Sequence, residues 1–295
     1  MSPSNDVAPA FCDTFPAVTT IRRRASRSLG AIKAGFARED TTLIAGGLTF
    51  YAVIAVVPLL LLTIRATALL VSAEWVRSGF DAVAALLPDA LDARAAVDGL
   101  ATAGIELSPI GVLISIFPAT FYGEGLRRAI VRFSPTRESF TGWRGRLAMV
   151  PFFAAAPVLL AGVLCVARLL GATTGDGGIG AMTLRVFLGF NCLWLILSVP
   201  LAWTYRVIAP RAVGWRALIV GSLVTSSIVT GFVHGFILFL AIPVDLGAPF
   251  GGLTAIGGGV AIMLWMFVFH ILALAGWLVT AEFDRPDDAA RTSTE

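Results

Sequence analysis

Long apolar segments separated by short polar loops dominate the pattern of this chain. The segments cover residues 43–71, 105–122, 146–170, 183–207, 217–240 and 253–281. A helix needs about 20 apolar residues to cross the ~30 Å hydrocarbon core of a bilayer. The second segment is the shortest, and Pro118 divides it. We therefore predict an all-α membrane protein with six transmembrane helices in one domain, residues 41–284.

Two further segments have the pattern of amphipathic helices. Between residues 21 and 36, apolar side chains recur every three or four positions with five basic residues among them. This pattern predicts a basic interfacial helix over residues 21–40. In residues 72–104, apolar and acidic positions alternate, which predicts one or two short amphipathic helices at the opposite membrane surface. The polar ends of the chain, 1–20 and 285–295, are predicted to be disordered tails.

The distribution of basic residues predicts the orientation in the membrane. The chain is 57% hydrophobic and only 14% charged, which excludes a soluble protein. Of its 22 lysine and arginine residues, 17 lie in the leader, in the loops after the second and fourth spans, and in the tail. The loops on the other side hold two, Arg77 and Arg94. Cytoplasmic loops are enriched in basic residues, so we predict cytoplasmic termini and no nucleic-acid partner.

Three stretches of the chain occur in an informative order. Residues 36–62 contain an acidic turn, small residues, the aromatic pair Phe50 and Tyr51, and Pro58. A basic loop then joins residues 125–128 to residues 143–146, and the last stretch runs from Tyr205 through a small-residue segment to Glu282. In order and spacing these stretches resemble the YihY/BrkB family of bacterial inner-membrane proteins, formerly labelled ribonuclease BN.

This resemblance implies a multi-pass protein of the bacterial inner membrane that supports envelope integrity and serum resistance. For some members of the family, export of lipid or lipopolysaccharide is suggested. The partners that the resemblance implies are membrane lipids, including an anionic lipid or lipopolysaccharide-type substrate. The sequence leaves the oligomeric state, the substrate and the energy source open.

The sequence does not favour the nuclease function in the old family label. Metal-dependent hydrolysis of a phosphodiester needs several carboxylates or histidines that converge on a metal. The two histidines, His234 and His270, lie in separate spans, and the three cysteines are far apart. The chain also lacks a GxxxxGK[ST] motif for ATP. We expect no enzyme activity, no metal and no cofactor.

Ionisable residues within the spans are candidates for a substrate-binding cavity. A guanidinium stays charged, so within hydrocarbon it must pair with another group or reach water. The acids that could neutralise the arginines on the outer side are Glu106, Asp176 and Asp245; otherwise the arginines line a polar cavity for anionic groups. The histidines either carry protons or bind a headgroup, or they hydrogen-bond across a helix interface. The candidates for this cavity are Arg65, Arg168, Arg185, His234, His270 and Tyr51.

Proline and glycine residues within the spans indicate where helices bend. An intramembrane proline removes one backbone hydrogen bond, and discontinuous helices often line the substrate site of a transporter. Close packing of helices through small residues is the alternative for the glycines. The predicted hinge residues are Pro58, Pro118, Pro157, Pro200, Gly251 and Gly252.

These observations leave two main functional hypotheses from different classes. The first is a transporter or lipid translocator with a polar cavity between bent helices. The second is an envelope scaffold that does not transport and binds a partner through residues 72–104. A shared cavity would favour the first hypothesis, and a closed bundle would favour the second.

Overall fold

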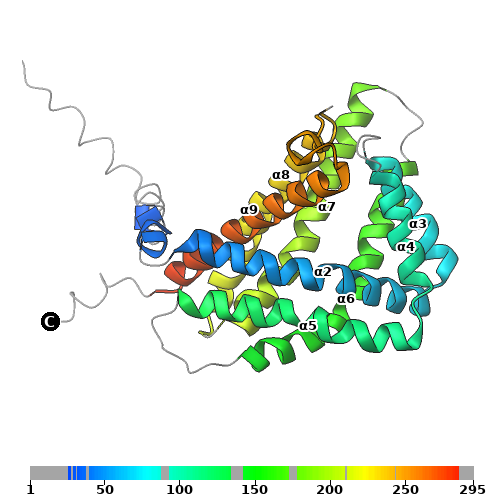
Figure 1. Cartoon of the computed structure of the whole chain (residues 1–295). Helices are drawn as coiled ribbons and strands as arrows, with labels where there is room; N and C mark the ends of the chain where they lie inside the picture. Colours follow the sequence, from blue (N-terminus) through cyan, green and yellow to red (C-terminus); the bar gives the residue numbers. More distant parts are fainter. Residues whose placement is uncertain are drawn as a thin grey trace, which may run out of the picture.

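The structure is a bundle of helices (Figure 1). This computed structural model describes residues 26–27, 29–30, 32–37, 40–87, 93–133, 142–172, 178–209, 211–242 and 244–285. Within these residues the chain is helical and contains no strand, which confirms the all-α prediction. The elements are α2 (Thr41–Leu70), α3 (Ala73–Leu86), α4 (Ala93–Ile105), α5 (Pro109–Arg132), α6 (Gly142–Ala172), α7 (Ile179–Trp203), η3 (Thr204–Ile208), α8 (Trp215–Leu240), η4 (Ala248–Phe250) and α9 (Thr254–Phe283). The predicted tail at 1–20 and residues 286–295 lie outside the described residues.

Six of the described helices are long and apolar enough to cross a membrane, as the sequence predicted. The second span differs most from its prediction, because α5 runs from Pro109 to Arg132 without interruption at Pro118. Pro58, Pro157 and Pro200 also lie inside continuous helices. A proline removes one hydrogen bond, and neighbouring helices can compensate for that loss in a membrane. Bending at these prolines stays a prediction.

The helical residues 32–37 before α2 contact the end of α9. A Cβ atom on Gly35 would lie 2.7 Å from the Cδ1 atom of Leu278. Asp40 caps the start of helix α2, and its carboxylate accepts hydrogen bonds from the Thr42 hydroxyl and the Leu43 amide. These two bonds hold the pKa of Asp40 below its usual value. The interfacial position of residues 21–40 stays a prediction.

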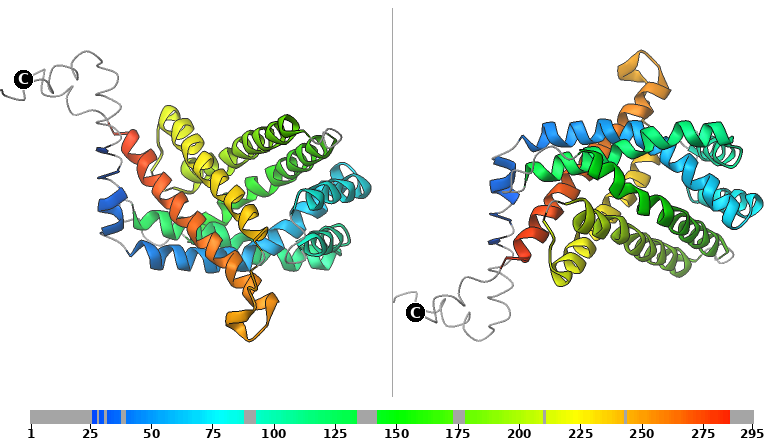
Figure 2. Two further views of the ribbon diagram at one scale, coloured as in Figure 1. Left: turned by 90° about the horizontal axis from the view of Figure 1, so that it is seen from above. Right: turned by 90° about the horizontal axis from the view of Figure 1, so that it is seen from below.

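The basic segments of the chain converge at one end of the bundle, which we call the basic end. Arg127 near the end of α5 donates to the Ile208 carbonyl oxygen at 2.6 Å. Arg211, in the loop before α8, pairs with Asp284 after α9 at 2.9 Å. Figure 2 shows the start of α2 and the end of α9 on the same side of the molecule. This end therefore brings together four segments that are distant in sequence.

Helices α3 and α4 form a hairpin at the opposite end of the bundle (Figure 1). The apolar face of α3 packs on the spans: Val76 and Phe80 are buried in one cluster with Ile64 of α2 and Leu164 of α6. A Cβ atom on Gly104 of α4 would lie 2.6 Å from the side chain of Ile64. The segment 72–104 thus contains two helices, and its apolar face is used within the molecule. Its location at a membrane surface stays a prediction.

Candidate functional site

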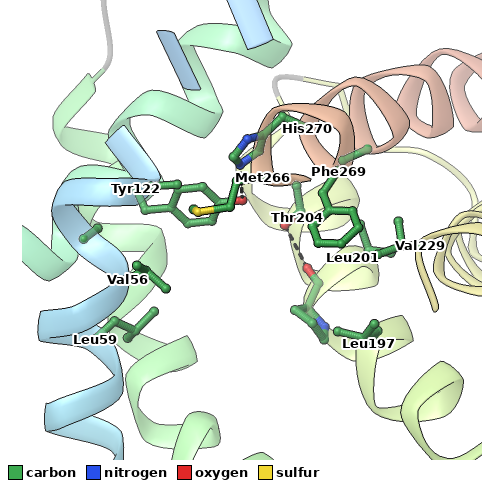
Figure 3. Close-up of a pocket in the computed structure, with 14 residues that line it drawn as sticks. Val56, Leu59, Tyr122, Leu197, Leu201, Thr204, Val229, Met266, Phe269 and His270 are labelled. Atoms are coloured by element: carbon green, nitrogen blue, oxygen red, sulfur yellow. Dashed lines mark hydrogen bonds between the residues drawn. The ribbon is translucent and has the colours of Figure 1, made fainter. Parts of the chain in front are cut away.

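A cavity of about 420 Å³ lies between two groups of helices. Figure 3 shows α2 and α5 on one side of it, and α7, α8 and α9 on the other. The lining residues are Ala52, Ala55, Val56 and Leu59 of α2, Tyr122 of α5, Leu197, Pro200 and Leu201 of α7, Thr204 of η3, Val229 of α8, and Met266, Phe269, His270 and Ala273 of α9. The contributions of α2, α8 and α9 come from the middle of these helices. The cavity therefore lies near the middle of the apolar layer.

The walls of the cavity are mostly apolar. Of its 14 lining residues, three have polar side chains, namely Tyr122, Thr204 and His270, and none is a carboxylate, a lysine or an arginine. Binding sites for small molecules typically enclose about 300–1,000 Å³ and combine apolar walls with a few polar groups. The size and lining of this cavity match that description.

His270 connects the two groups of helices by hydrogen bonds from its ring. The residue is 5% exposed. Its Nδ1 atom lies 3.0 Å from the hydroxyl oxygen of Thr49 on α2, and its Nε2 atom lies 3.2 Å from the hydroxyl oxygen of Tyr122 on α5. Figure 3 shows the imidazole and the phenol side by side at the upper edge of the cavity. One residue of α9 is thus held by both helices of the opposite group.

Thr204 lies in η3, a single π-helical turn that continues α7. Its hydroxyl donates to the Pro200 carbonyl oxygen at 2.8 Å. Next to it, the fully buried Tyr205 donates its hydroxyl proton to the Ala273 carbonyl oxygen of α9 at 2.7 Å. π-helical turns are rare and occur frequently at functional sites. This one forms part of the cavity wall.

A family model described as "Virulence factor BrkB" matches residues 32–295 of the chain. The chain belongs to this BrkB family. The match covers all six long apolar helices, so the protein is a multi-pass membrane protein. No curated protein and no solved structure matches the chain.

In this BrkB-family protein, the predicted site residues lie in several different surroundings. His270 lines the cavity, whereas Arg65, Arg168, Arg185, His234 and Tyr51 are not among its lining residues. His234 of α8 hydrogen-bonds the Thr230 carbonyl oxygen through Nδ1 at 2.9 Å, and its ring lies 5.4 Å from that of Phe190. Tyr51 packs on Gly125 of α5, and Arg185 is half-buried near the start of α7. Whether any of these residues binds a substrate stays a prediction.

Two of the intramembrane arginines hold the α3–α4 hairpin. Arg65 of α2 donates from Nη1 to the Ile105 carbonyl oxygen at the end of α4, at 2.6 Å. Arg168 of α6 donates to the Trp75 carbonyl oxygen and to the Ser78 hydroxyl, and its guanidinium lies 4.0 Å from the centre of the Trp75 ring. Backbone carbonyls and an aromatic face thus stabilise these charges, an arrangement that the sequence analysis did not consider.

The residues predicted as glycine hinges lie in the loop before α9. Gly251 and Gly252 have φ angles of 67° and 83°, in the left-handed region that favours glycine. The Gly252 amide donates to the Gly247 carbonyl oxygen at 2.9 Å, which closes a tight turn. Asp245, one of the acids considered as an arginine partner, accepts from the Gly247 amide at 2.9 Å. These residues therefore shape a turn outside the cavity.

A buried carboxylate at the basic end was missed by the sequence analysis. Glu124 of α5 is 7% exposed and accepts from Arg128 at 2.5 Å and from Arg146 of α6 at 2.6 Å. The Arg146 guanidinium also lies 4.2 Å from the centre of the Phe121 ring. The spacing of Glu124 and Arg128 by four positions was the available signal. Within the described residues, no group of three or more His, Cys, Asp or Glu side chains could hold a metal ion.

Proposed function

We propose that this BrkB-family protein binds and translocates lipid-like amphiphiles within the bacterial inner membrane, in support of envelope integrity. The observation that carries the proposal is the cavity between the two groups of helices, which residues of five spans line. Substrate sites of many transporters lie near the midplane of the bilayer between helices that move relative to one another. Both termini are cytoplasmic in this proposal, because 17 basic residues lie in the segments on that side and two in the loops on the other.

The character of the lining supports an apolar chain as the part of the substrate that occupies the cavity. None of its 14 lining residues is a carboxylate, a lysine or an arginine, and eleven are apolar. Burial of a charged group without a partner is strongly unfavourable, so these walls do not favour an anionic group. The guanidiniums of Arg65 and Arg168, which would attract an anion, bind the α3–α4 hairpin instead. Membrane lipids and the lipid part of a lipopolysaccharide-type molecule are the proposed substrates.

The structure offers less support to the alternative function as a scaffold. That hypothesis needs an apolar face in residues 72–104 that is free to bind a partner. Val76 and Phe80 of α3 are instead buried against α2 and α6. These two apolar side chains are therefore not free to bind a partner, and the cavity is the stronger candidate.

The proposal can be tested by filling the cavity. Val56 of α2 and Val229 of α8 line it, whereas their neighbours Val57 and Ile228 are 50% and 48% exposed on the outside of the bundle. The larger side chains of Val56→Phe and Val229→Phe should slow the movement of a fluorescent lipid between the leaflets of proteoliposomes. An overpacking cost of about 1–3 kcal/mol on substrate binding corresponds to about 5- to 150-fold in affinity.

The matched controls are Val57→Phe and Ile228→Phe, which add similar volume on the same helices but face outward. They should translocate the lipid at the wild-type rate. Equal rates for all four variants and the wild type, at equal protein levels, would refute the cavity as the translocation site. Absence of protein-dependent movement in the wild type would refute translocation of that lipid.

A further inference from the structure

The hydroxyl groups at the cavity already have hydrogen-bond partners within the protein. Thr204 lines the cavity and donates its single hydroxyl proton to the Pro200 carbonyl oxygen at 2.8 Å. A hydroxyl carries one proton and two acceptor lone pairs. The Thr204 oxygen can therefore accept a hydrogen bond from a cavity ligand, but it has no proton to donate to one.

Whether Tyr122 has a hydroxyl proton to donate into the cavity depends on the tautomer of His270. Thr49 donates its hydroxyl proton to the Ala45 carbonyl oxygen at 2.8 Å. Towards the His270 Nδ1 atom, 3.0 Å away, the Thr49 oxygen can then act only as an acceptor. With the Thr49 proton on the Ala45 carbonyl oxygen, we assign the imidazole proton to Nδ1.

This tautomer determines the direction of the bond between His270 and Tyr122. His270 is 5% exposed, and both ring nitrogens face hydroxyl groups rather than carboxylates. Burial without an anionic partner favours the neutral ring, in which one nitrogen is a donor and the other an acceptor. With the proton on Nδ1, the Nε2 atom accepts, so the Tyr122 hydroxyl donates across the 3.2 Å distance. Tyr122 also has no proton left for the cavity.

We infer that the cavity selects an amphiphile whose polar group is a neutral hydrogen-bond donor, such as a hydroxyl or amide N–H group, on an apolar chain. This inference rests on the proposed function and identifies its substrate class. The Tyr122 and Thr204 hydroxyls donate to His270 and to the Pro200 carbonyl oxygen, so both oxygens remain available as acceptors to a ligand in the cavity. Figure 3 labels Tyr122, Thr204 and His270 around the cavity. A donor group satisfies these oxygens. An ether or a phosphate brings only further acceptors, so neither its oxygens nor those of Tyr122 and Thr204 gain a hydrogen bond.

Binding of three probes with one chain length tests the inference. The probes are dodecan-1-ol, its methyl ether and dodecyl phosphate, and the full chain in lipid nanodiscs is titrated with each by calorimetry. We expect the alcohol to bind about tenfold more tightly than the ether, because the alcohol gains a hydrogen bond that the ether cannot make and the ether leaves polar groups unpaired. The phosphate should bind more weakly than the alcohol. Equal binding of alcohol and ether, or tightest binding of the phosphate, would overturn the inference.

Substitution of His270 should shift the binding preference from the alcohol towards the ether, which a purely structural role of His270 would not produce. In His270→Leu the Tyr122 hydroxyl loses its acceptor and becomes free to donate into the cavity, so affinity for the ether should rise relative to the alcohol. His234→Leu is the matched control, because His234 is not among the lining residues, and it should keep the wild-type preference. An unchanged preference in a folded His270→Leu protein would overturn the assigned tautomer.

A second set of variants covers the case in which His270→Leu fails to fold. Tyr122→Phe and Thr204→Val each remove one acceptor oxygen, and the double variant should bind alcohol and ether equally. A persistent preference for the alcohol in the double variant would show that other groups select it. Failure of the proposed function can be told apart from failure of this inference. The translocation assay with Val56→Phe and Val57→Phe tests the function, and its result does not depend on how the three probes bind.

Discussion

Thr225 of α8 fills the space beside Gly276 of α9 that a side chain would otherwise occupy. A Cβ atom on Gly276 would overlap the Thr225 side chain, and one on Gly221 of α8 would overlap Thr280 of α9 in the same way. Each threonine donates to the carbonyl oxygen of the glycine four positions earlier in its own helix, at 2.7 Å. The antiparallel helices α8 and α9 therefore approach closely at two glycines, with both hydroxyls satisfied.

Substitution of these glycines should separate α8 from α9. We expect Gly276→Ala or Gly221→Ala to lower the free energy of unfolding by about 1–3 kcal/mol, because the added methyl group overpacks the contact. Gly231→Ala and Gly259→Ala are controls on the same two helices, where a Cβ atom would have open space. They should be neutral or stabilising by up to about 1 kcal/mol. The stabilities of the four variants can be compared by thermal unfolding in detergent, followed by circular dichroism. If the two contact variants were as stable as the two controls, the close contact between α8 and α9 would be contradicted.

Loss of Arg168 should release helix α3 from α6. Arg168→Gln removes the charge that lies on the Trp75 ring and weakens the bonds to the Trp75 carbonyl and Ser78 hydroxyl oxygens. Hydrogen bonds to charged groups contribute about 1.5–3 kcal/mol each, so amide exchange in residues 73–86 should become faster. Arg77→Gln, an exposed position on α3, should leave this exchange unchanged. Unchanged exchange in Arg168→Gln combined with lost translocation would instead place Arg168 in the transport mechanism.

Glu124 should be far more important for stability than an exposed glutamate. Glu124→Ala removes the acceptor of the hydrogen bonds from Arg128 and Arg146, whose side chains are 45% and 28% exposed, so the loss should be about 1.5–3 kcal/mol. Glu74→Ala removes an exposed carboxylate from α3 and should change stability by less than about 1 kcal/mol. Chemical unfolding of both variants in mixed micelles provides the comparison. Similar stabilities would mean that Glu124 and its arginines contribute no net stabilisation.

The proposed orientation predicts opposite sides for two reporter fusions. A fusion after Gly177, between the third and fourth spans, should report the extracytoplasmic side, and a fusion after Glu295 should report the cytoplasm. Alkaline phosphatase is active only outside the cytoplasm, so the first fusion should be active and the second inactive. The same result at both positions would refute the arrangement of the last three spans.

The sequence predicts the spans well because apolar segments are a local signal. The predicted segment 217–240 differs by two residues from the observed Trp215–Leu240. The second span is the exception, since its helix continues well beyond residue 122 to Arg132. Glu124 pairs with Arg128, and Arg127 binds a carbonyl, so charged residues extend this helix past the apolar window. Contacts with other helices, which hydropathy does not record, make that extension favourable.

The site was predictable only in part, because its contacts join distant positions. The search for ionisable residues in apolar spans identified His270, which lines the cavity. Its partner Tyr122 lies 148 positions away, and no local pattern connects the two. For Arg65 the sequence directed attention to acids, whereas the partner is the backbone carbonyl of Ile105. Every residue has such a carbonyl, so no motif marks it.

The π-helical turn at η3 couples the cavity to the basic end through helical register. The Ala209 amide donates to the Thr204 carbonyl oxygen, five positions earlier, so this turn contains one residue more than an α-helical turn. Conversion to α-helical geometry would rotate the residues on one side of the turn by about 100° relative to the other. Thr204 presents its oxygen to the cavity at the start of the turn, and Ile208 holds Arg127 at its end. A shift of one residue in this helix would thus move either the acceptor in the cavity or the anchor of α5, so both depend on the same register.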